Sequence, residues 1–268
     1  MDKITTTKLK EMKKSGEKIA MLTAYDFSMA QMLNEAGIEV LLVGDSLGMV
    51  KRGYENTLPV TVEDILFCTR AVKAGNSKAL LVADMPFMSF EISPEDAVRN
   101  AGRLVKEGGA EAVKIEGGVE VIEQIKSIIR AKIPVMGHIG LTPQAINQLG
   151  GFKVQGRNHD SAEKLMDAAK ELEKAGIFAL VLECVPEAVG GLISASISIP
   201  TIGIGAGVKC DGQVLVIDDV LGLYHEQAFK PKFVKKYADL RKEIVKAAGE
   251  YKREVKEKIF PSEEHSYK

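Results

Sequence analysis

The chain has 268 residues, a length typical of a single barrel of eight alternating strands and helices. Its 36 basic and 37 acidic residues give a net charge of −1, and no basic patch with aromatic residues occurs, so we expect neither a nucleic-acid partner nor a membrane surface. The polar amino terminus does not resemble a signal peptide, and no apolar run is long enough to cross a bilayer. Three widely spaced cysteines fit reduced thiols better than disulfides or a zinc site. We therefore expect a cytoplasmic protein.

Apolar runs of strand length alternate with segments of helical periodicity along the whole chain. The expected strands are 19–24, 40–43, 80–83, 112–116, 134–139, 178–184, 200–204 and 214–217. The expected helices are 5–15, 27–35, 61–73, 94–107, 119–131, 161–174, 187–196 and a region within 231–258. Two long connections interrupt the alternation: 47–60, which we expect to be a functional loop, and 140–160, expected as a lid-like loop or a short helix.

This alternation predicts an α/β protein, a (β/α)8 TIM barrel, with residues 1–268 forming one domain. The first helix is expected to close the bottom of the barrel, and the last helical region to form a carboxyl-terminal extension. A doubly wound open sheet remains the alternative, because periodicity does not show whether a sheet closes.

Several expected strands end in an ionisable residue. These residues are Asp45 (after Gly44), Asp84, Glu116, His138 and Glu183. In a parallel barrel the carboxyl ends of the strands meet at one mouth, so these side chains should converge. Closely spaced carboxylates repel one another unless a cation is present, and oxygen ligands favour Mg²⁺ over Zn²⁺. The alternative is that each acid is a solvated loop residue or a helix cap.

The Val-Lys-Ile-Glu pattern places Lys114 and Glu116 on the same face of their strand. An inward lysine beside a carboxylate suits an anionic substrate, although a structural salt bridge is the alternative. His138 fits a satisfied core histidine as well as it fits a ligand or a hydrogen-bond donor to substrate. Glu183 has apolar neighbours, which favour a role as a general base or acid.

The glycine-rich segment 203–207 follows the seventh expected strand. Barrels often bind a phosphate at this position, but close approach of the backbone to any bulky group explains the glycines equally well.

Motifs along nearly the whole chain are similar to those of the ketopantoate (3-methyl-2-oxobutanoate) hydroxymethyltransferase family. They include Thr-Ala-Tyr-Asp at 23–26, Val-Gly-Asp-Ser-Leu-Gly-Met at 43–49, Asp-Met-Pro-Phe-Met at 84–88, Val-Lys-Ile-Glu-Gly-Gly at 113–118, Gly-His-Ile-Gly-Leu-Thr-Pro-Gln at 137–144, Leu-Glu-Cys-Val-Pro at 182–186 and Gly-Ile-Gly-Ala-Gly at 203–207. One departure lies at 216–219, where Val-Ile-Asp-Asp stands in place of the His before a single Asp that many relatives carry.

The resemblance implies a Mg²⁺-dependent enzyme that transfers a hydroxymethyl group from 5,10-methylenetetrahydrofolate to 3-methyl-2-oxobutanoate, giving 2-dehydropantoate in the first step of pantothenate biosynthesis. It implies metal contacts, direct or through water, for Asp45, Asp84 and Glu116. It implies keto-acid contacts for Ser46, Asp84 and Lys114, which we extend to Asp45 and His138, and a proton-accepting role for Glu183. A chelated 2-oxo acid is acidified next to its ketone, so that a stabilised enolate can attack the one-carbon unit.

Two other functions remain open at this point. One is a different Mg²⁺-enolate barrel of the phosphoenolpyruvate mutase and isocitrate lyase kind; those relatives typically carry a reactive loop cysteine, which segment 140–160 lacks. The other is a barrel that binds metabolites without turnover. The family forms large rings, commonly decamers, and the carboxyl-terminal apolar positions Phe233, Tyr237, Leu240 and Ile244 need a partner, so we expect a homo-oligomer. The alternative is that this helix packs only on its own barrel.

Overall fold

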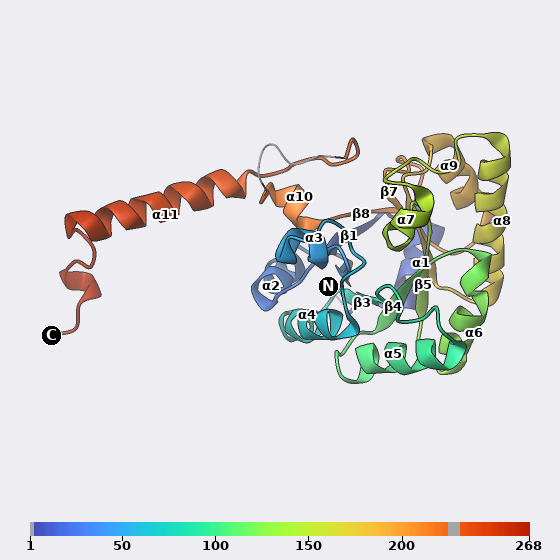
Figure 1. Cartoon of the computed structure of the whole chain (residues 1–268), viewed down its shortest axis with the longest axis horizontal. Coiled ribbons are helices and arrows are strands. Elements are labelled where there is room, and N and C mark those ends of the chain that lie inside the picture. Colours follow the sequence, from blue (N-terminus) through green and yellow to red (C-terminus); the bar gives the residue numbers. More distant parts are fainter. Residues whose placement is uncertain (1–2, 225–230) are drawn as a thin grey trace. The chain divides into compact units, whose positions relative to one another are not determined.

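The computed structural model describes residues 3–224 and 231–268, and the strands in the described part of the chain form one closed parallel barrel (Figure 1). The strands are β1 (Ile19–Thr23), β2 (Val40–Val43), β3 (Leu80–Asp84), β4 (Ala112–Glu116), β5 (Val135–Gly140), β6 (Ala179–Glu183), β7 (Thr201–Ile204) and β8 (Gly212–Leu215). Each strand pairs with the next in sequence, and β8 returns to β1 with Met21 opposite Val214. The predicted (β/α)8 barrel is therefore confirmed, and the open-sheet alternative is wrong.

The strands form where the sequence is continuously apolar because both of their faces are covered. Every residue of β2, β3 and β4 is buried, and the barrel helices pack around them (Figure 1). These helices are α2 (Phe27–Glu35), α4 (Val62–Gly75), α5 (Pro94–Lys106), α6 (Ile122–Arg130), α8 (His159–Ala175) and α9 (Glu187–Ser196). Several begin at side-chain caps, such as Thr61, which accepts a hydrogen bond from the Asp64 backbone N–H, and Ser93, which precedes Pro94.

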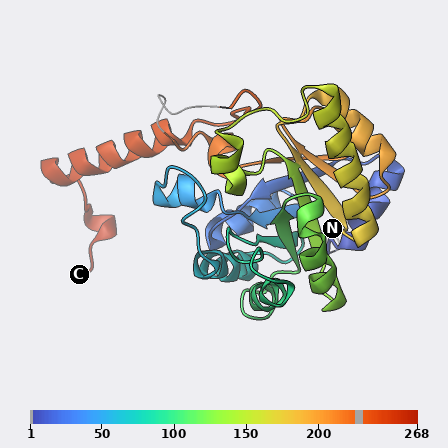
Figure 2. The same ribbon diagram turned by 45° about the vertical axis from the view of Figure 1, so that its right-hand side comes forward.

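Helix α1 (Thr6–Ser15) covers the amino-terminal end of the barrel, as predicted. Its Leu9 and Met12 are fully buried, and Lys13 binds Asp211, the residue directly before β8. In Figure 2, α1 lies on the opposite side of the strands from α3 (Leu47–Arg52) and α7 (Ile146–Leu149), which belong to the long connections after β2 and β5. The barrel thus has a closed end and an end built from loops.

Three local predictions differ from the structure. The connection 47–60, expected as a loop, begins with the short helix α3, and strand β8 begins two residues earlier than expected and gives way at Ile217 to α10 (Ile217–Leu221). The carboxyl-terminal helix α11 (Leu240–Glu257) is shorter than the predicted region, so that Phe233 and Tyr237 precede it. Within 140–160, the predicted short helix is present as η2 (Pro143–Ala145) followed by α7.

The chain divides into two compact units, Met1–Val216 and Ile217–Lys268. The first contains the barrel, and the second contains α10, α11 and a final turn, η3 (Glu263–His265). The prediction that all 268 residues form one domain stays a prediction. Helices long and apolar enough to span a membrane are absent from the described residues.

Candidate active site

The strand register brings the predicted ionisable residues together at the carboxyl end of the barrel. Asp84 of β3 is paired with Lys114 of β4, and Glu116 of β4 is paired with His138 of β5. Glu183 ends β6 opposite Gly140. Residues that are paired on adjacent parallel strands lie next to each other. The pairing of the strands therefore places these side chains side by side.

Lys114 lies at the centre of this group. Its Nζ is 2.6 Å from Asp84 Oδ1, 3.7 Å from Glu116 Oε1 and 3.2 Å from His138 Nδ1. All four side chains are almost completely buried, which strengthens the interactions between their charges. Lys114 and Glu116 share one face of β4, as the alternating pattern predicted.

His138 links two carboxylates that are far apart in sequence. Its Nδ1 is 3.3 Å from Glu116 Oε1, and its Nε2 is 3.3 Å from Glu183 Oε2. Sequence reasoning gave this histidine little weight, yet it connects Glu183 to the other acids. Gly140 lets β5 and β6 remain close there, because it has a positive φ of 99° and a Cβ would lie 2.2 Å from the Glu183 carbonyl oxygen.

Asp45 lies just beyond β2 and is held by two other residues of the site. Its backbone N–H donates to Asp84 Oδ2 (3.1 Å), and its Oδ2 accepts from Gln144 Nε2 (2.9 Å). Gln144 also donates its backbone N–H to Glu116 Oε2 (3.0 Å) and its side-chain amide to the Met85 carbonyl (3.0 Å). Gln144 therefore bridges the loops after β2 and β3 and the last residue of β4.

Ser46 lies at the edge of the site. Its Oγ is 2.9 Å from the hydroxyl of Tyr25, which follows β1. Ser46 is half-buried. Gln144 and Tyr25 occur in the family-like motifs, but our reasoning assigned neither a role. The only available signal was that each closely follows a strand end.

Burial and crowding shift the ionisation of the whole group. Burial, followed by repulsion from Asp84 and Glu116, raises the pKa of Asp45 to about 8, against Lys114 and Gln144. Burial also raises the pKa of Asp84, although Lys114 opposes the shift. Burial also acts to raise the pKa of Glu116, but the positive charges of His138 and Lys114 outweigh burial and hold that pKa below its ordinary value.

The two basic groups remain charged near neutral pH. Burial and the Lys114 ammonium lower the pKa of His138, but Glu116 and Glu183 outweigh them and raise it to about 9. Burial similarly opposes the charged form of Lys114, yet its carboxylate neighbours raise its pKa above the ordinary range. The site therefore combines four carboxyl groups with two cations, and burial opposes the ionisation of Asp45 and Asp84, which a bound metal ion would favour.

The donor chemistry fits Mg²⁺. In the described residues, no three His, Cys, Asp or Glu side chains converge as a ready-made metal-binding group. Mg²⁺ does not require such a group, because it usually binds one or two carboxylates and keeps several water molecules. Asp45 and Asp84 supply buried carboxylate oxygens. Glu116 is connected to them through Lys114 and Gln144, which contact its carboxylate.

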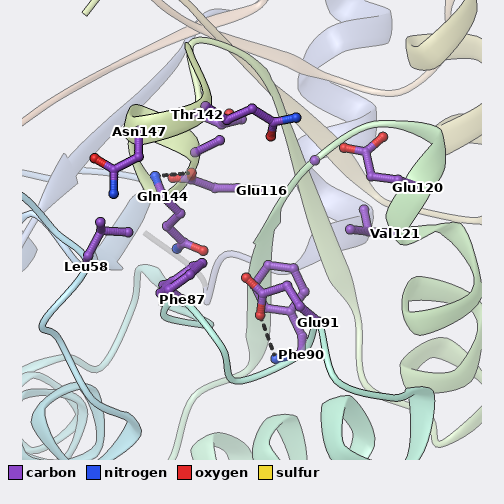
Figure 3. Close-up of a pocket in the computed structure, with 13 residues that line it drawn as sticks. Leu58, Phe87, Phe90, Glu91, Glu116, Glu120, Val121, Thr142, Gln144 and Asn147 are labelled. Atoms are coloured by element: carbon purple, nitrogen blue, oxygen red, sulfur yellow. Dashed lines mark hydrogen bonds between the residues drawn. The ribbon is translucent and has the colours of Figure 1, made fainter. Parts of the chain in front are cut away.

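A pocket of about 360 Å³ opens beside Glu116 and Gln144 (Figure 3). It is lined by Leu58, Phe87, Phe90, Glu91, Glu116, Gly117, Glu120, Val121, Thr142, Gln144, Ala145, Asn147 and Gln148. Its walls thus come from the connections after β2, β3, β4 and β5, on the same end of the barrel as the ionisable group. The glycines at 203–207 lie outside this pocket.

A closed parallel barrel with buried carboxylates, a lysine and a histidine at the carboxyl ends of its strands has the architecture of an enzyme. The comparisons with known proteins identify which family of enzymes. The chain belongs to the ketopantoate hydroxymethyltransferase family, whose model matches residues 3–263.

Relatives are similar over their full length. The 3-methyl-2-oxobutanoate hydroxymethyltransferase of Carboxydothermus hydrogenoformans is 58% identical over 267 residues, which cover 100% of this chain and 96% of the relative. The protein of the same name from Enterococcus faecalis is 58% identical over 266 residues, covering 99% and 96%. The predicted resemblance is confirmed.

Solved structures of other enzymes share the fold. Phosphonopyruvate hydrolase in complex with oxalate and Mg²⁺ has a TM-score of 0.62 at 13% identity, covering 98% of this chain and 93% of that chain. A 2,3-dimethylmalate lyase has a TM-score of 0.58 at 13% identity, covering 98% and 91%. At such low identity these similarities show the barrel fold alone.

Proposed function

We propose that this protein transfers a hydroxymethyl group from 5,10-methylenetetrahydrofolate to 3-methyl-2-oxobutanoate, giving 2-dehydropantoate for pantothenate biosynthesis. The names of its full-length relatives support transfer of a hydroxymethyl group to 3-methyl-2-oxobutanoate. One structural observation carries the chemistry: a buried lysine lies between Asp84, Glu116 and His138, and His138 reaches Glu183 on its other side. A 2-oxo acid needs this combination of cations for its carboxylate and a base for its acidic C–H bond.

Asp45 and Asp84 would hold Mg²⁺, with Glu116 contributing through water. When bound, the metal ion would withdraw charge from the keto acid and acidify the C3–H bond next to the ketone. Lys114 and Ser46 would bind and orient the keto acid, because the ammonium attracts the substrate carboxylate and the Ser46 hydroxyl can donate to an oxygen. These roles agree with the ones that the resemblance implied.

Glu183 would accept the C3 proton. The neighbouring ring of His138 directs Nε2 toward Glu183 and Nδ1 toward Glu116. His138 would thereby fix the orientation of the Glu183 carboxylate, which makes it a positioning residue. The C3 carbon then forms a bond to the methylene carbon of the folate. Water supplies the hydroxyl group, and the two bonds from the methylene carbon to the folate nitrogens break. One nitrogen takes the remaining proton of the water and the other takes the proton that Glu183 accepted from C3, so that tetrahydrofolate leaves.

A coupled assay tests the reaction. The protein is supplied with 3-methyl-2-oxobutanoate and methylenetetrahydrofolate, and formation of 2-dehydropantoate is measured with Mg²⁺, with EDTA, and with EDTA followed by excess Mg²⁺. We expect turnover that EDTA abolishes and Mg²⁺ restores. Full activity in EDTA contradicts the metal assignment, and binding of the keto acid without turnover identifies a non-catalytic barrel instead.

We also propose that the protein assembles as a homo-oligomer, with the family's decamer as the expected size. The support is that large apolar side chains of the second unit are exposed: Tyr237 at 68%, Ile244 at 57%, Val245 at 61% and Tyr251 at 59%. Three of these side chains lie along α11 and Tyr237 lies just before it, and exposed apolar side chains grouped in this way mark an interaction surface. Light scattering at micromolar concentration measures the mass, and a monomer mass contradicts the proposal.

A further inference from the structure

The pocket beside the ionisable group is lined by apolar, amide and carboxylate side chains. Figure 3 shows Leu58 and Asn147 on one side, Glu120, Val121, Glu91 and Phe90 on the other, and Glu116 and Gln144 between them. Apolar surface comes from Phe87, which is 40% exposed, and from the more deeply buried Phe90 and Val121. A volume of about 360 Å³ is at the small end of the range for small-molecule sites. The pocket therefore suits a compact ligand.

Two carboxylates of the pocket, those of Glu91 and Glu120, accept hydrogen bonds from nearby backbone N–H groups. Glu91 Oε2 accepts a hydrogen bond from the Phe90 backbone N–H (3.2 Å), and Glu120 Oε1 accepts one from the Gly118 N–H (2.8 Å). Among the described residues, no lysine, arginine or histidine pairs with either carboxylate. Each carboxylate is thus held in position by its own backbone and has acceptor capacity for a ligand.

Gln144 gives an independent indication that the pocket takes a polar ligand. Gln144 is 6% exposed, and its Oε1 has no hydrogen-bond partner in the described part of the chain, while its Nε2 donates to Asp45 and to the Met85 carbonyl. A buried acceptor without a partner is costly. A ligand N–H in the pocket would satisfy it.

We infer that this pocket binds the pterin ring of the folate, with Glu91 accepting hydrogen bonds from its amino-pyrimidine edge and Phe87 packing against its face. This inference rests on the proposed folate-dependent reaction. A pterin is flat, presents adjacent N–H donors at one edge, and matches a pocket with aromatic walls and unneutralised carboxylates. The pocket's small volume accommodates this head group rather than a whole folate, so the benzoyl-glutamate tail would extend outside.

The position of the pocket also fits the reaction. Glu116 belongs both to the pocket lining and to the group around Lys114, so the two spaces are adjacent. A pterin in the pocket would present its one-carbon unit toward the keto acid, with Gln144 contacting both sites. Of the two carboxylates we assign Glu91 as the main acceptor, because it is half-buried whereas Glu120 is exposed.

The test measures binding rather than turnover. The dissociation constant of tetrahydrofolate is determined by anaerobic calorimetry with Mg²⁺ and keto acid present, for the wild type, Glu91→Gln, Ala145→Phe and Glu95→Gln. Glu91→Gln removes the charged acceptor and should weaken binding roughly 10-fold or more. Ala145→Phe fills the pocket and should weaken it at least as much. Glu95→Gln is the matched control on the exposed start of α5, with an expected change of less than about twofold.

The outcomes separate this inference from the proposed function. Unchanged tetrahydrofolate affinity in both Glu91→Gln and Ala145→Phe overturns the pocket assignment, while binding and turnover by the wild type still support the reaction. A wild type that exchanges the keto-acid C3 proton but does not bind tetrahydrofolate overturns the folate donor itself. If Glu91→Gln weakens Mg²⁺ binding and leaves folate binding intact, the pocket is a cation site and the assignment is wrong. Thermal unfolding of each variant confirms that it is folded.

Discussion

Two lysine–aspartate pairs lie at opposite ends of the same barrel, and their surroundings differ. At the closed end, Lys13 Nζ is 2.8 Å from Asp211 Oδ2 and also donates to two backbone carbonyls, while Thr201 donates to the same carboxylate oxygen through its N–H and hydroxyl. At the open end, Lys114 is 2.6 Å from Asp84, with Asp45, Glu116 and His138 packed around it.

The difference indicates what each pair does. The protein itself uses the hydrogen-bonding capacity of Lys13 and Asp211, so this pair serves to fasten α1 to the barrel. The Lys114 group instead gathers more carboxylates than cations and, within the described residues, leaves the buried Gln144 Oε1 without a hydrogen-bond partner. Such an arrangement costs stability and is typical of a site prepared for ligands. Substitutions at the two ends should therefore affect different quantities.

The largest expected effect is at Glu183. Glu183→Gln keeps the shape and removes the basicity, so turnover should fall roughly 10²–10⁴-fold. Exchange of the keto-acid C3 proton with deuterated solvent, followed by NMR, isolates this step from the folate chemistry. The matched control is Glu173→Gln near the closed end, where Glu173 accepts hydrogen bonds from Ser198; it should affect stability and not exchange. Exchange at the wild-type rate in Glu183→Gln would mean that another group is the base.

The next effect compares the two lysines directly. Lys114→Met should lower turnover on the order of 10²–10³-fold, because a buried cation at the reacting anion is lost. Lys13→Met should leave turnover within about twofold and lower the free energy of unfolding by about 2 kcal/mol, because Asp211 loses its partner. Steady-state kinetics and urea unfolding of both variants measure the contrast. Comparable losses of turnover in the two variants would remove the distinction between the ends.

Replacing Asp45 and replacing Asp211 by asparagine should change the free energy of unfolding in opposite directions. The pKa of Asp45 in the folded protein is about 8, above the 3.8 of the model compound, so the folded state binds the proton more tightly and loses stability as pH rises from about 4 to 8. In EDTA, Asp45→Asn should therefore raise the free energy of unfolding by about 1–3 kcal/mol at pH 8 and by less at pH 5. Asp211→Asn should lower it, because Lys13 and Thr201 lose a charged partner. Denaturant titrations at pH 5 and pH 8 measure the free energy of unfolding of both variants. An Asp45→Asn variant that is less stable than the wild type at pH 8 contradicts the prediction.

The smallest effect concerns Thr201. Its hydroxyl donates to Asp211 Oδ2 at 2.9 Å and lies 2.7 Å from Ser194 Oγ. Thr201→Val preserves the shape of the side chain and should lower the free energy of unfolding by about 1–2 kcal/mol without changing turnover. Chemical denaturation together with the coupled assay measures both quantities. A reduced turnover at normal stability would show that the closed end contributes to the reaction.

The sequence was sufficient for the barrel and for much of the candidate site. Buried strands are recognisable from continuous apolar runs, and the residues at their ends must meet in a parallel barrel, so Asp84, Lys114 and Glu116 could be placed together in advance. The alternation of side chains along β4 predicted that Lys114 and Glu116 are neighbours. These predictions depend only on strand geometry.

Other features depend on contacts that no local pattern encodes. The linking position of His138 depends on the register of three strands, and Gln144 lies in a connection without periodicity, so its amide contacts could not be anticipated. Helix α3 has six residues, too few to show a helical pattern. The start of β8 includes Gly212 and Gln213, which are weak strand formers, and the pairing with β1 determines its position.

The position of His138 has a consequence for observing the site. The chain contains four histidines, so a protein labelled with ¹⁵N only at histidine would give a sparse NMR spectrum. When its ring is neutral, His138 can accept from Lys114 at Nδ1 and donate to Glu183 at Nε2; when protonated, it donates to Glu116 and Glu183. Its two nitrogen resonances therefore report separately on the Glu116 side and on the Glu183 side of the ionisable group, which makes this imidazole a built-in spectroscopic probe.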